Sequence, residues 1–372
     1  MSFLEGIKAI PGDIGSVPTG RGKLKRAAEI GKVLVDEALG VVRAIPYGVR
    51  ALRLHRSLPD AVAGARDARG VRIVRDVRYA SAPRAVMDVY LPDGASLANG
   101  AGAIADAVGG RGGGGGGGGG DSDSSAFPVA LFVHGGVWAV GEKWHFAPMA
   151  SRLAEEGVIA CVATYTLFPR AEADQMWREV SDAVGFTLEN ARGFGGDDAR
   201  VSLIGHSAGA HVCSMALLHR CGVVSDDVGG GASADDPAAR RMPKQFLGLF
   251  LAFLFAHPSR SIPALGAFQL LHLTPFNSTP TFARMEWPLG LCGVYDVGRH
   301  YEYEDSRGVA LLSTMGRAMG GREKFPQCSP VRVVRGNRGA VGGEYAYDVE
   351  DPQARSIRWS PYDRVGEVNA VP

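Results

Sequence analysis

Residues 201–211 read Val201-Ser-Leu-Ile-Gly205-His-Ser207-Ala-Gly209-Ala-His211. The first four are typical of a buried strand, and a helical segment over 208–219 begins directly after Ser207. Between strand and helix lies the pattern G-x-S-x-G, which in this context puts a serine on a sharp, strained turn. With 52 glycines in 372 residues the pattern could arise by chance, so a second signal is needed.

A second motif lies upstream. The apolar run over 127–133 predicts a buried strand that ends in His134-Gly-Gly-Val-Trp138. Loops of this H-G-G type donate backbone N–H groups to the oxyanion of an acyl-transfer intermediate. The two motifs in this order predict an α/β-hydrolase fold, with a mostly parallel sheet and helices on both faces. The candidate site residues are the nucleophile Ser207 and, for the oxyanion hole, Gly135, Gly136 and Ala208.

The remaining sequence predicts one domain with appendages. We expect the α/β-hydrolase domain over 66–330, a basic helical N-terminal segment over 1–65 and an irregular tail over 331–372. Residues 95–125 contain nine consecutive glycines and predict a flexible insertion between two strands. The other expected elements are strands at 71–80, 85–91, 158–166 and 289–294 and helices at 143–156, 173–190 and 307–320.

Two segments leave alternatives open. The N-terminal segment predicts a basic helix over 22–56, interrupted at Pro46, and such a helix either lies on an anionic membrane or packs on the domain with a solvated basic face. We slightly favour packing. Residues 246–256 are uncharged and apolar, and they predict either a buried helix or a hydrophobic lid near the site. Burial is the commoner explanation for such a run.

Composition narrows the remaining function classes. A net charge of +1 gives no argument for nucleic-acid binding. The five cysteines show no metal-ligand spacing, so we expect reduced, mostly buried thiols and a protein that faces the cytosol. Neither a secretory signal nor an apolar stretch of about 18 residues, as a membrane span needs, is apparent. We expect no metal and no cofactor.

The general base is harder to find. A serine hydroxyl is a weak nucleophile and needs a base, usually a histidine that a carboxylate orients. In α/β-hydrolases the chain order is serine, acid, histidine. The last histidine is His300, just after Asp296 and too early for the usual base, while His211 and His219 lie on the helix that leaves the serine. Either the sequence stops before the last two strand–helix units, which we favour, or the protein has lost its base.

The chain resembles the isoprenylcysteine methylesterases, a plant and algal family in the lipase/esterase branch of the α/β-hydrolases. The similarity covers about residues 75–334, with gaps at two insertions. The matching segments are Met87-Asp-Val-Tyr-Leu-Pro92, His134-Gly-Gly-Val-Trp138, Tyr165-Thr-Leu-Phe-Pro169, Gly195-Gly-Asp197, Gly205-His-Ser-Ala-Gly-Ala-His211, Leu291-Cys-Gly-Val-Tyr-Asp296 with His300, and Gln327-Cys-Ser-Pro330. The first motifs occur in many esterases; the stretch after Trp287 and the basic N-terminus favour the methylesterases.

The resemblance implies hydrolysis of a carboxyl methyl ester on a prenylated cysteine. The substrate would be a small molecule or a prenylated protein, met at an endomembrane (endoplasmic reticulum or Golgi) that faces the cytosol, or alternatively in the cytoplasm. The family's acid and histidine have no counterpart in the matching segments, so the activity of this polypeptide would be low. The alternatives are a general carboxylesterase or formamidase, and a non-catalytic binding protein on an esterase scaffold.

Overall fold

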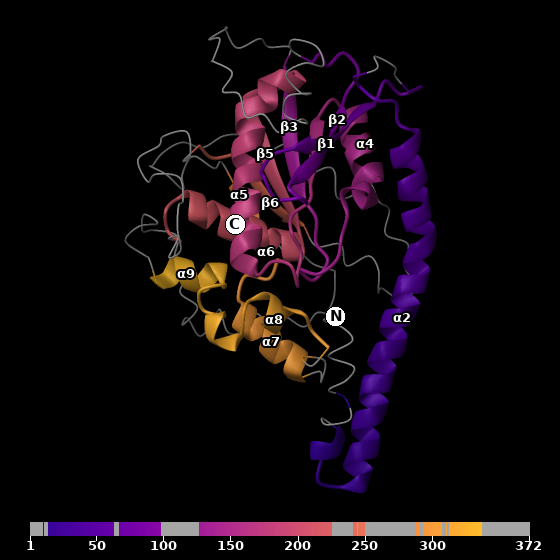
Figure 1. The fold of residues 1–372 in the computed structure, drawn as a ribbon, viewed down its shortest axis with the longest axis vertical. Coiled ribbons are helices and arrows are strands. Elements are labelled where there is room, and N and C mark those ends of the chain that lie inside the picture. Colours follow the sequence, from indigo (N-terminus) through magenta and orange to yellow (C-terminus); the bar gives the residue numbers. More distant parts are fainter. Residues whose placement is uncertain are drawn as a thin grey trace, which may run out of the picture.

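The computed structural model describes residues 14–62, 67–97, 126–224, 241–243, 245–249, 287–290, 293–306 and 312–336, together with Ile10 and Ala310. Within this part of the chain one sheet contains seven strands in the order β1-β2-β4-β3-β5-β6-β7 (Figure 1). The strands are β1 (Arg72–Arg78), β2 (Val86–Leu91), β3 (Phe127–Val133), β4 (Ile159–Ala163), β5 (Gly196–His206), β6 (Gln245–Leu249) and β7 (Trp287–Gly290).

The strand directions fit the predicted architecture. Strands β1, β2 and β4 pair antiparallel, whereas β4, β3, β5, β6 and β7 run parallel to one another. Parallel neighbours need crossover connections, and helices supply them. Between β3 and β4 lies α4 (Ala147–Glu155), and between β4 and β5 lies α5 (Ala173–Asn190). The α/β-hydrolase fold predicted from the sequence is confirmed.

Helices cover both faces of the sheet. Strands β3 and β4 are buried at almost every position, so successive side chains enter two different cores. Leu131 belongs to the core with Met176 of α5 and with residues of α6 (Ala208–Arg220). Phe132, its neighbour in the chain, belongs to the other core, with α4 and with Leu58 at the end of α2 (Gly20–Ser57). This alternation explains the unbroken apolar sequence of the central strands.

Helix α2 is longer and straighter than the sequence predicts. It begins after Thr19, whose hydroxyl accepts the N–H of Gly22 at 3.1 Å, and it runs through Pro46 to Ser57 without a break. The predicted interruption at Pro46 is therefore wrong. Proline removes one intrahelical hydrogen bond, but the helix surface around Pro46 is exposed, and water can hydrate the freed carbonyl group. None of the helices in the described ranges is long and apolar enough to cross a membrane.

The prediction of a helix or lid over 246–256 is wrong for its first residues. Gln245–Leu249 form strand β6, and Phe246 and Gly248 pair in parallel with Leu203 and Gly205 of β5. A short strand inside a parallel sheet carries no polar alternation, so its pattern matches that of a buried helix. Residues 250–256 lie outside the described residues.

The boundaries of late elements also differ from the prediction. The strand expected over 289–294 begins earlier, as β7, and residues 293–296 are not in a strand. The helix expected over 307–320 is reduced to α8 (Met315–Ala318). An additional helix, α7 (Val297–Ser306), precedes it, and the predicted irregular tail begins with α9 (Pro330–Gly336). Helix α7 begins where the Asp296 carboxylate accepts the N–H of Arg299 at 3.1 Å, a capping bond that patterning does not reveal. Residues 98–125 of the glycine-rich insertion and 337–372 of the tail lie outside the described residues.

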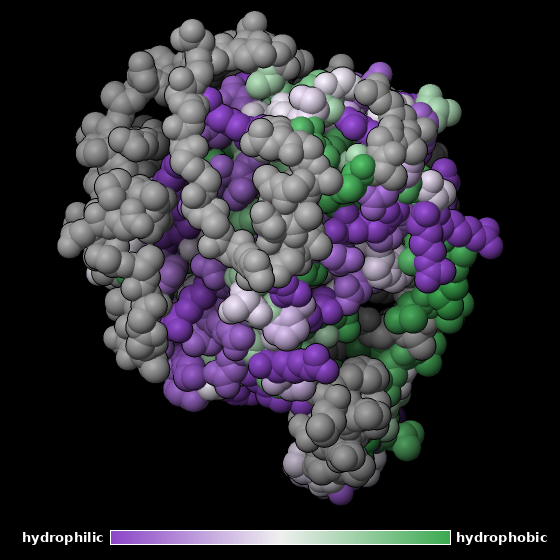
Figure 2. Space-filling model, turned by 45° about the horizontal axis from the view of Figure 1, so that its top comes forward, coloured by the Kyte–Doolittle hydropathy of each residue, from purple (hydrophilic) through white to green (hydrophobic). Residues whose placement is uncertain are grey.

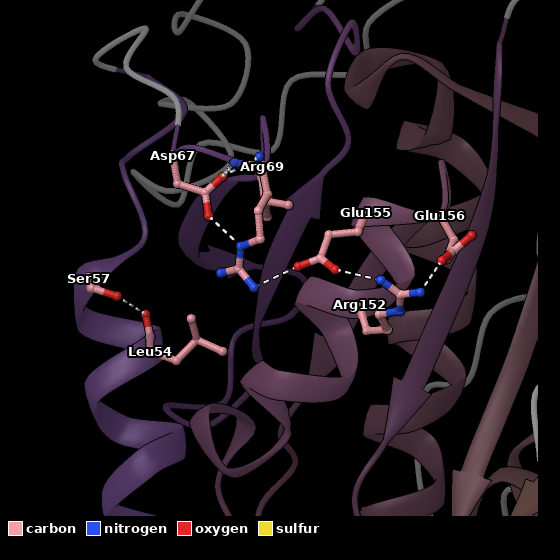
Figure 3. A network of polar contacts seen from close by, with 8 residues as sticks. Leu54, Ser57, Asp67, Arg69, Arg152, Glu155 and Glu156 are labelled. Carbon is pink, nitrogen blue, oxygen red and sulfur yellow. Dashed lines mark hydrogen bonds and ion pairs between the residues drawn. The ribbon is translucent and has the colours of Figure 1, made fainter. Parts of the chain in front are cut away.

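A chain of exposed ion pairs joins the 67–69 turn to α4 (Figure 3). Arg69 contacts Asp67 at 3.1 Å and Glu155 at 2.6 Å, and Arg152 contacts Glu155 at 2.9 Å and Glu156 at 2.5 Å. Exposed pairs of this kind contribute about 0–1 kcal/mol each. They orient the turn, while the two apolar cores hold the sheet together.

Candidate active site

The predicted nucleophile lies at the turn between β5 and α6. Strand β5 ends at His206, helix α6 begins at Ala208, and Ser207 has φ +52° and ψ −118°. Residues with a Cβ rarely adopt this conformation, which costs about 1–3 kcal/mol. The start of α6 directly behind Ser207 also favours negative charge near the serine. Strand, strained serine and helix follow one another as the sequence predicts.

Two glycines make the turn sterically possible. A Cβ added at Gly205 would lie 2.6 Å from the Cα of Ala210 on α6. A Cβ added at Gly209 would lie 2.4 Å from the carbonyl oxygen of Val133, at the end of β3. Both contacts involve backbone atoms, which cannot rotate away as a side chain can. The glycines therefore allow α6 to start close against β3 and β5.

The H-G-G loop passes directly beside Ser207. A Cβ added at Gly135 would lie 2.9 Å from the Cβ of Ser207 and 2.5 Å from the carbonyl oxygen of His206. Gly136 has φ +127°, and its carbonyl accepts the N–H groups of Ala139 and Val140. Among the described residues, no backbone carbonyl accepts the N–H of Gly135, Gly136 or Ala208. The structure thus brings the four predicted site residues together, and their catalytic roles stay predictions.

A buried histidine beneath the site connects three parts of the chain. His211 on α6 is fully buried; its Nδ1 accepts the indole N–H of Trp138 at 3.1 Å, and its Nε2 donates to the carbonyl oxygen of Cys328 at 2.7 Å. Burial lowers the pKa of His211 to about 4, although the hydrogen bond to Cys328 acts in the opposite direction. His211 is therefore neutral at pH 7, with its proton on Nε2. Sequence reasoning did not predict these contacts, which join residues 73 and 117 positions apart.

Two residues with a strained backbone follow Gly136, and hydrogen bonds from outside the loop hold both of them in place. Val137 and Trp138 have φ values of +46° and +61°. The hydroxyl of Thr314 donates to the carbonyl oxygen of Val137 at 2.5 Å, and the N–H of Phe168 donates to that of Trp138 at 2.9 Å. The loop conformation thus depends on Phe168, which follows strand β4 in the chain, and on Thr314.

His134 is a structural part of the loop. It is fully buried, its Nδ1 donates to the carbonyl oxygen of Gly135 at 2.8 Å, and its ring stacks on Tyr165 with centroids 4.9 Å apart. The hydroxyl of Tyr165 donates to the carbonyl oxygen of His134 at 3.1 Å. Burial lowers the pKa of His134 to about 4, which keeps the ring neutral.

The described residues include no base for Ser207. Within the described ranges no histidine ring is hydrogen-bonded to the Ser207 hydroxyl, and both ring nitrogens of His211 are bonded to Trp138 and Cys328. His300 lies 3.6 Å from Glu304 on its own helix. Asp296 caps α7 and pairs with Arg332 at 3.1 Å, so its carboxylate has a structural role. His257 and His272 lie outside the described residues.

Comparison with known proteins connects these features to esterases. A family model described as BD-FAE matches residues 120–228. "Probable isoprenylcysteine alpha-carbonyl methylesterase ICMEL1" of Oryza sativa subsp. japonica is 31% identical over 149 residues, which is 40% of this chain and 28% of that protein. "Kynurenine formamidase" of Danio rerio is 26% identical over 155 residues, 41% of this chain and 42% of that protein. This chain thus spans less than half the length of these curated relatives.

Among solved structures, an inhibited "ESTERASE B from LACTOBACILLUS RHAMNOSIS" covers 81% of this chain and 72% of its own, with a TM-score of 0.45 and 15% identity. That likeness is too distant to bear on the fold, which the strand order and the crossover helices establish. The segment matched by the family model, residues 120–228, contains the H-G-G loop and the serine turn. The predicted resemblance is confirmed: this chain has an α/β-hydrolase fold and, over 149 residues, is similar to the isoprenylcysteine methylesterases.

Proposed function

We propose that this chain is a serine-dependent carboxylic ester hydrolase. The observation that carries the proposal is the strained turn at Ser207, pressed against Gly135, with three N–H groups that no described backbone carbonyl accepts. In the proposed reaction the Ser207 oxygen attacks the acyl carbon, and the N–H groups of Gly135, Gly136 and Ala208 bind the oxyanion. The alcohol leaves with a proton, and water then hydrolyses the acyl-enzyme and regenerates the serine.

The reaction needs a proton acceptor for the Ser207 hydroxyl. His211 is unsuited because it is fully buried and both of its ring nitrogens are held in hydrogen bonds to Trp138 and Cys328. We infer that the base comes from outside the described residues. Without a base, the oxyanion donors and binding alone give about 10³–10⁴-fold acceleration over water.

We propose a carboxyl methyl ester of a prenylated cysteine as the substrate class, presented as a small molecule or on a protein. The support is the similarity to a protein named an isoprenylcysteine alpha-carbonyl methylesterase, over 149 residues of this chain. A general carboxylesterase or a formamidase is the nearest alternative, supported by the similarity to a kynurenine formamidase. Since a prenyl chain partitions into lipid, the proposed place of action is a cytosol-facing endomembrane.

The test compares three proteins: the wild type, Ser207→Ala and Ser214→Ala. Ser214 also lies on α6, and its hydroxyl donates to the carbonyl oxygen of Ala210 at 2.8 Å, so it is a matched serine away from the turn. Each is incubated with the methyl ester of farnesylcysteine and with N-formylkynurenine, and products are measured by mass spectrometry. We expect ester cleavage by the wild type and Ser214→Ala, and none by Ser207→Ala. Ester binding without turnover would instead support a binding protein, and faster cleavage of the formamide would support the formamidase.

A further inference from the structure

Helix α2 presents an apolar stripe that the rest of the described chain does not cover. Val35, Val42 and Ile45 are 57%, 59% and 56% exposed. The other exposed large apolar residues of the helix are Leu24, Leu39, Val41, Tyr47 and Val49. Figure 1 shows α2 along one side of the molecule, with its N-terminal half projecting past the sheet, and Figure 2 shows hydrophobic residues gathered along that flank. Monomeric soluble domains rarely expose a continuous apolar face of this kind.

The stripe follows one side of the helix. At about 100° per residue, its six members fall within an arc of about 120°. These six are Leu24, Val35, Leu39, Val42, Ile45 and Val49. Among the buried residues of α2, Gly40 and Ala51 fall on the opposite side, and Ile30 lies about 120° from the centre of the stripe. The stripe therefore faces away from the hydrolase domain.

Basic side chains form a row along one edge of the stripe. Lys25, Lys32, Arg43 and Arg50 are exposed and, at the same 100° step, lie within about 20° of one another, next to Leu39. Counted from the sequence, α2 has nine Lys or Arg and three Asp or Glu, a net charge of +6, while the whole chain has +1. Positive charge is thus concentrated on the element that carries the apolar stripe.

We propose that α2 binds the surface of an anionic lipid membrane, with the stripe entering the headgroup region and the basic row contacting lipid phosphates and carboxylates. An interfacial helix has this combination of an apolar face and flanking Lys and Arg. Juxtamembrane basic residues are attracted to anionic lipid over about one Debye length. The proposal does not depend on the reaction at Ser207.

A second copy of the chain fits the same surface less well. If two copies of α2 formed a coiled coil along this stripe, the e positions beside the seam would include Lys25, Lys32 and Arg53. The g positions of the other helix, which face these e positions, would include Ala27, Leu34 and Val41. None of the three can form an ion pair with Lys or Arg. Two helices of net charge +6 would also repel each other, whereas an anionic surface attracts them.

The test is flotation of residues 1–372 with vesicles of phosphatidylcholine alone or with about 30% phosphatidylserine, at about 0.1 M and 0.5 M salt. We expect binding to the anionic vesicles at low salt, and at least a tenfold weaker partition in 0.5 M salt or on neutral vesicles. The stripe variant combines Val42→Gln and Ile45→Gln. The row variant replaces all four residues of the basic row with Gln: Lys25, Lys32, Arg43 and Arg50. Each should weaken binding about tenfold or more.

Tyr47→Gln is the matched control, because Tyr47 is 73% exposed on the same helix but lies about 140° from the centre of the stripe. It should bind like the wild type, as should Ser207→Ala, which separates this result from any failure of catalysis. Circular dichroism checks that the variants fold. Equal binding by the stripe variant and the wild type overturns the proposal. So does a dimer in light scattering that the stripe variant dissociates, which would assign the stripe to a second copy.

Discussion

At the scale of single residues, the site depends on backbone conformations that its neighbours impose. Ser207, Val137 and Trp138 all have positive φ, which L-residues rarely adopt. Each such residue costs about 1–3 kcal/mol, so the surrounding contacts must offset the strain. For the H-G-G loop the offset comes from hydrogen bonds to Thr314 and His211. At Ser207, Gly205 and Gly209 leave the room that the turn needs.

Gly209→Ala tests the close approach of α6 to the H-G-G loop. The new Cβ would lie 2.4 Å from the carbonyl oxygen of Val133 and 2.5 Å from that of His134, so the backbone must move. We expect a loss of about 1–3 kcal/mol in the free energy of unfolding, measured in urea. Gly193→Ala is the control, since a Cβ there meets nothing within 4 Å. Equal stability of the two variants would contradict the packing described for the serine turn.

The pH dependence of stability tests the neutral state of His211. Its pKa in the folded protein is about 4, below the ordinary value of 6.5. As the pH falls from 6.5 to 4, the unfolded chain takes up a proton that the folded protein does not, so this stability is present above pH 6.5 and is lost on acidification. The free energy of unfolding of the wild type should therefore fall as the pH drops from 6.5 to 4. In His211→Gln we expect this slope to be smaller, by up to about 1.4 kcal/mol per pH unit. Identical slopes for variant and wild type would show that folding does not lower the pKa of His211.

At the scale of elements, a buried carboxylate anchors α2 to the sheet. Asp88 on β2 is fully buried; it accepts from His55 of α2 at 2.8 Å and from the backbone N–H of Asp76 at 3.0 Å, and Lys143 lies 3.3 Å away. Lys143 also pairs with Asp76 at 2.8 Å. One carboxylate thus joins α2, the bulge in β1 and the loop before α4.

Asp88→Ala should therefore loosen the C-terminal end of α2. Removing one member of a buried charge cluster costs about 3–5 kcal/mol, because His55 loses its partner and Lys143 keeps only Asp76. We expect that loss in urea unfolding, and faster hydrogen exchange of the amides at 51–58. Asp174→Ala is the control, since Asp174 is exposed and lies 3.9 Å from Arg178. If the two substitutions cost the same, Asp88 does not anchor the helix.

The elements differ in how far sequence alone can predict them. Helix α5 was predicted at its observed bounds, because its apolar residues repeat at helical spacing over 18 residues. For β6 the sequence predicts a buried helix or a lid instead of a strand, because a buried parallel strand shows no alternation. Helix α7 was missed, because its start depends on Asp296 acting as a cap, which a sequence does not distinguish from a catalytic acid.

At the scale of the whole molecule, the sequence predicted the four site residues from two local motifs, since each motif encodes its own turn. The support of that site is not local. Trp138, His211 and Cys328 meet only because β3, α6 and the segment before α9 converge, and no spacing rule reports contacts over 73 or 117 residues. The same holds for Asp88 and His55, which the fold brings to 2.8 Å.

The central claim is that Ser207 is the nucleophile, and mapping a covalent adduct tests it most directly. Residues 1–372 are incubated with a fluorophosphonate, digested and analysed by mass spectrometry, alongside Ser207→Ala and Ser214→Ala. We predict one adduct, on the peptide that contains Ser207; it is retained in Ser214→Ala and absent from Ser207→Ala. An adduct that persists in Ser207→Ala, or a wild-type protein modified only at another serine, would contradict the account.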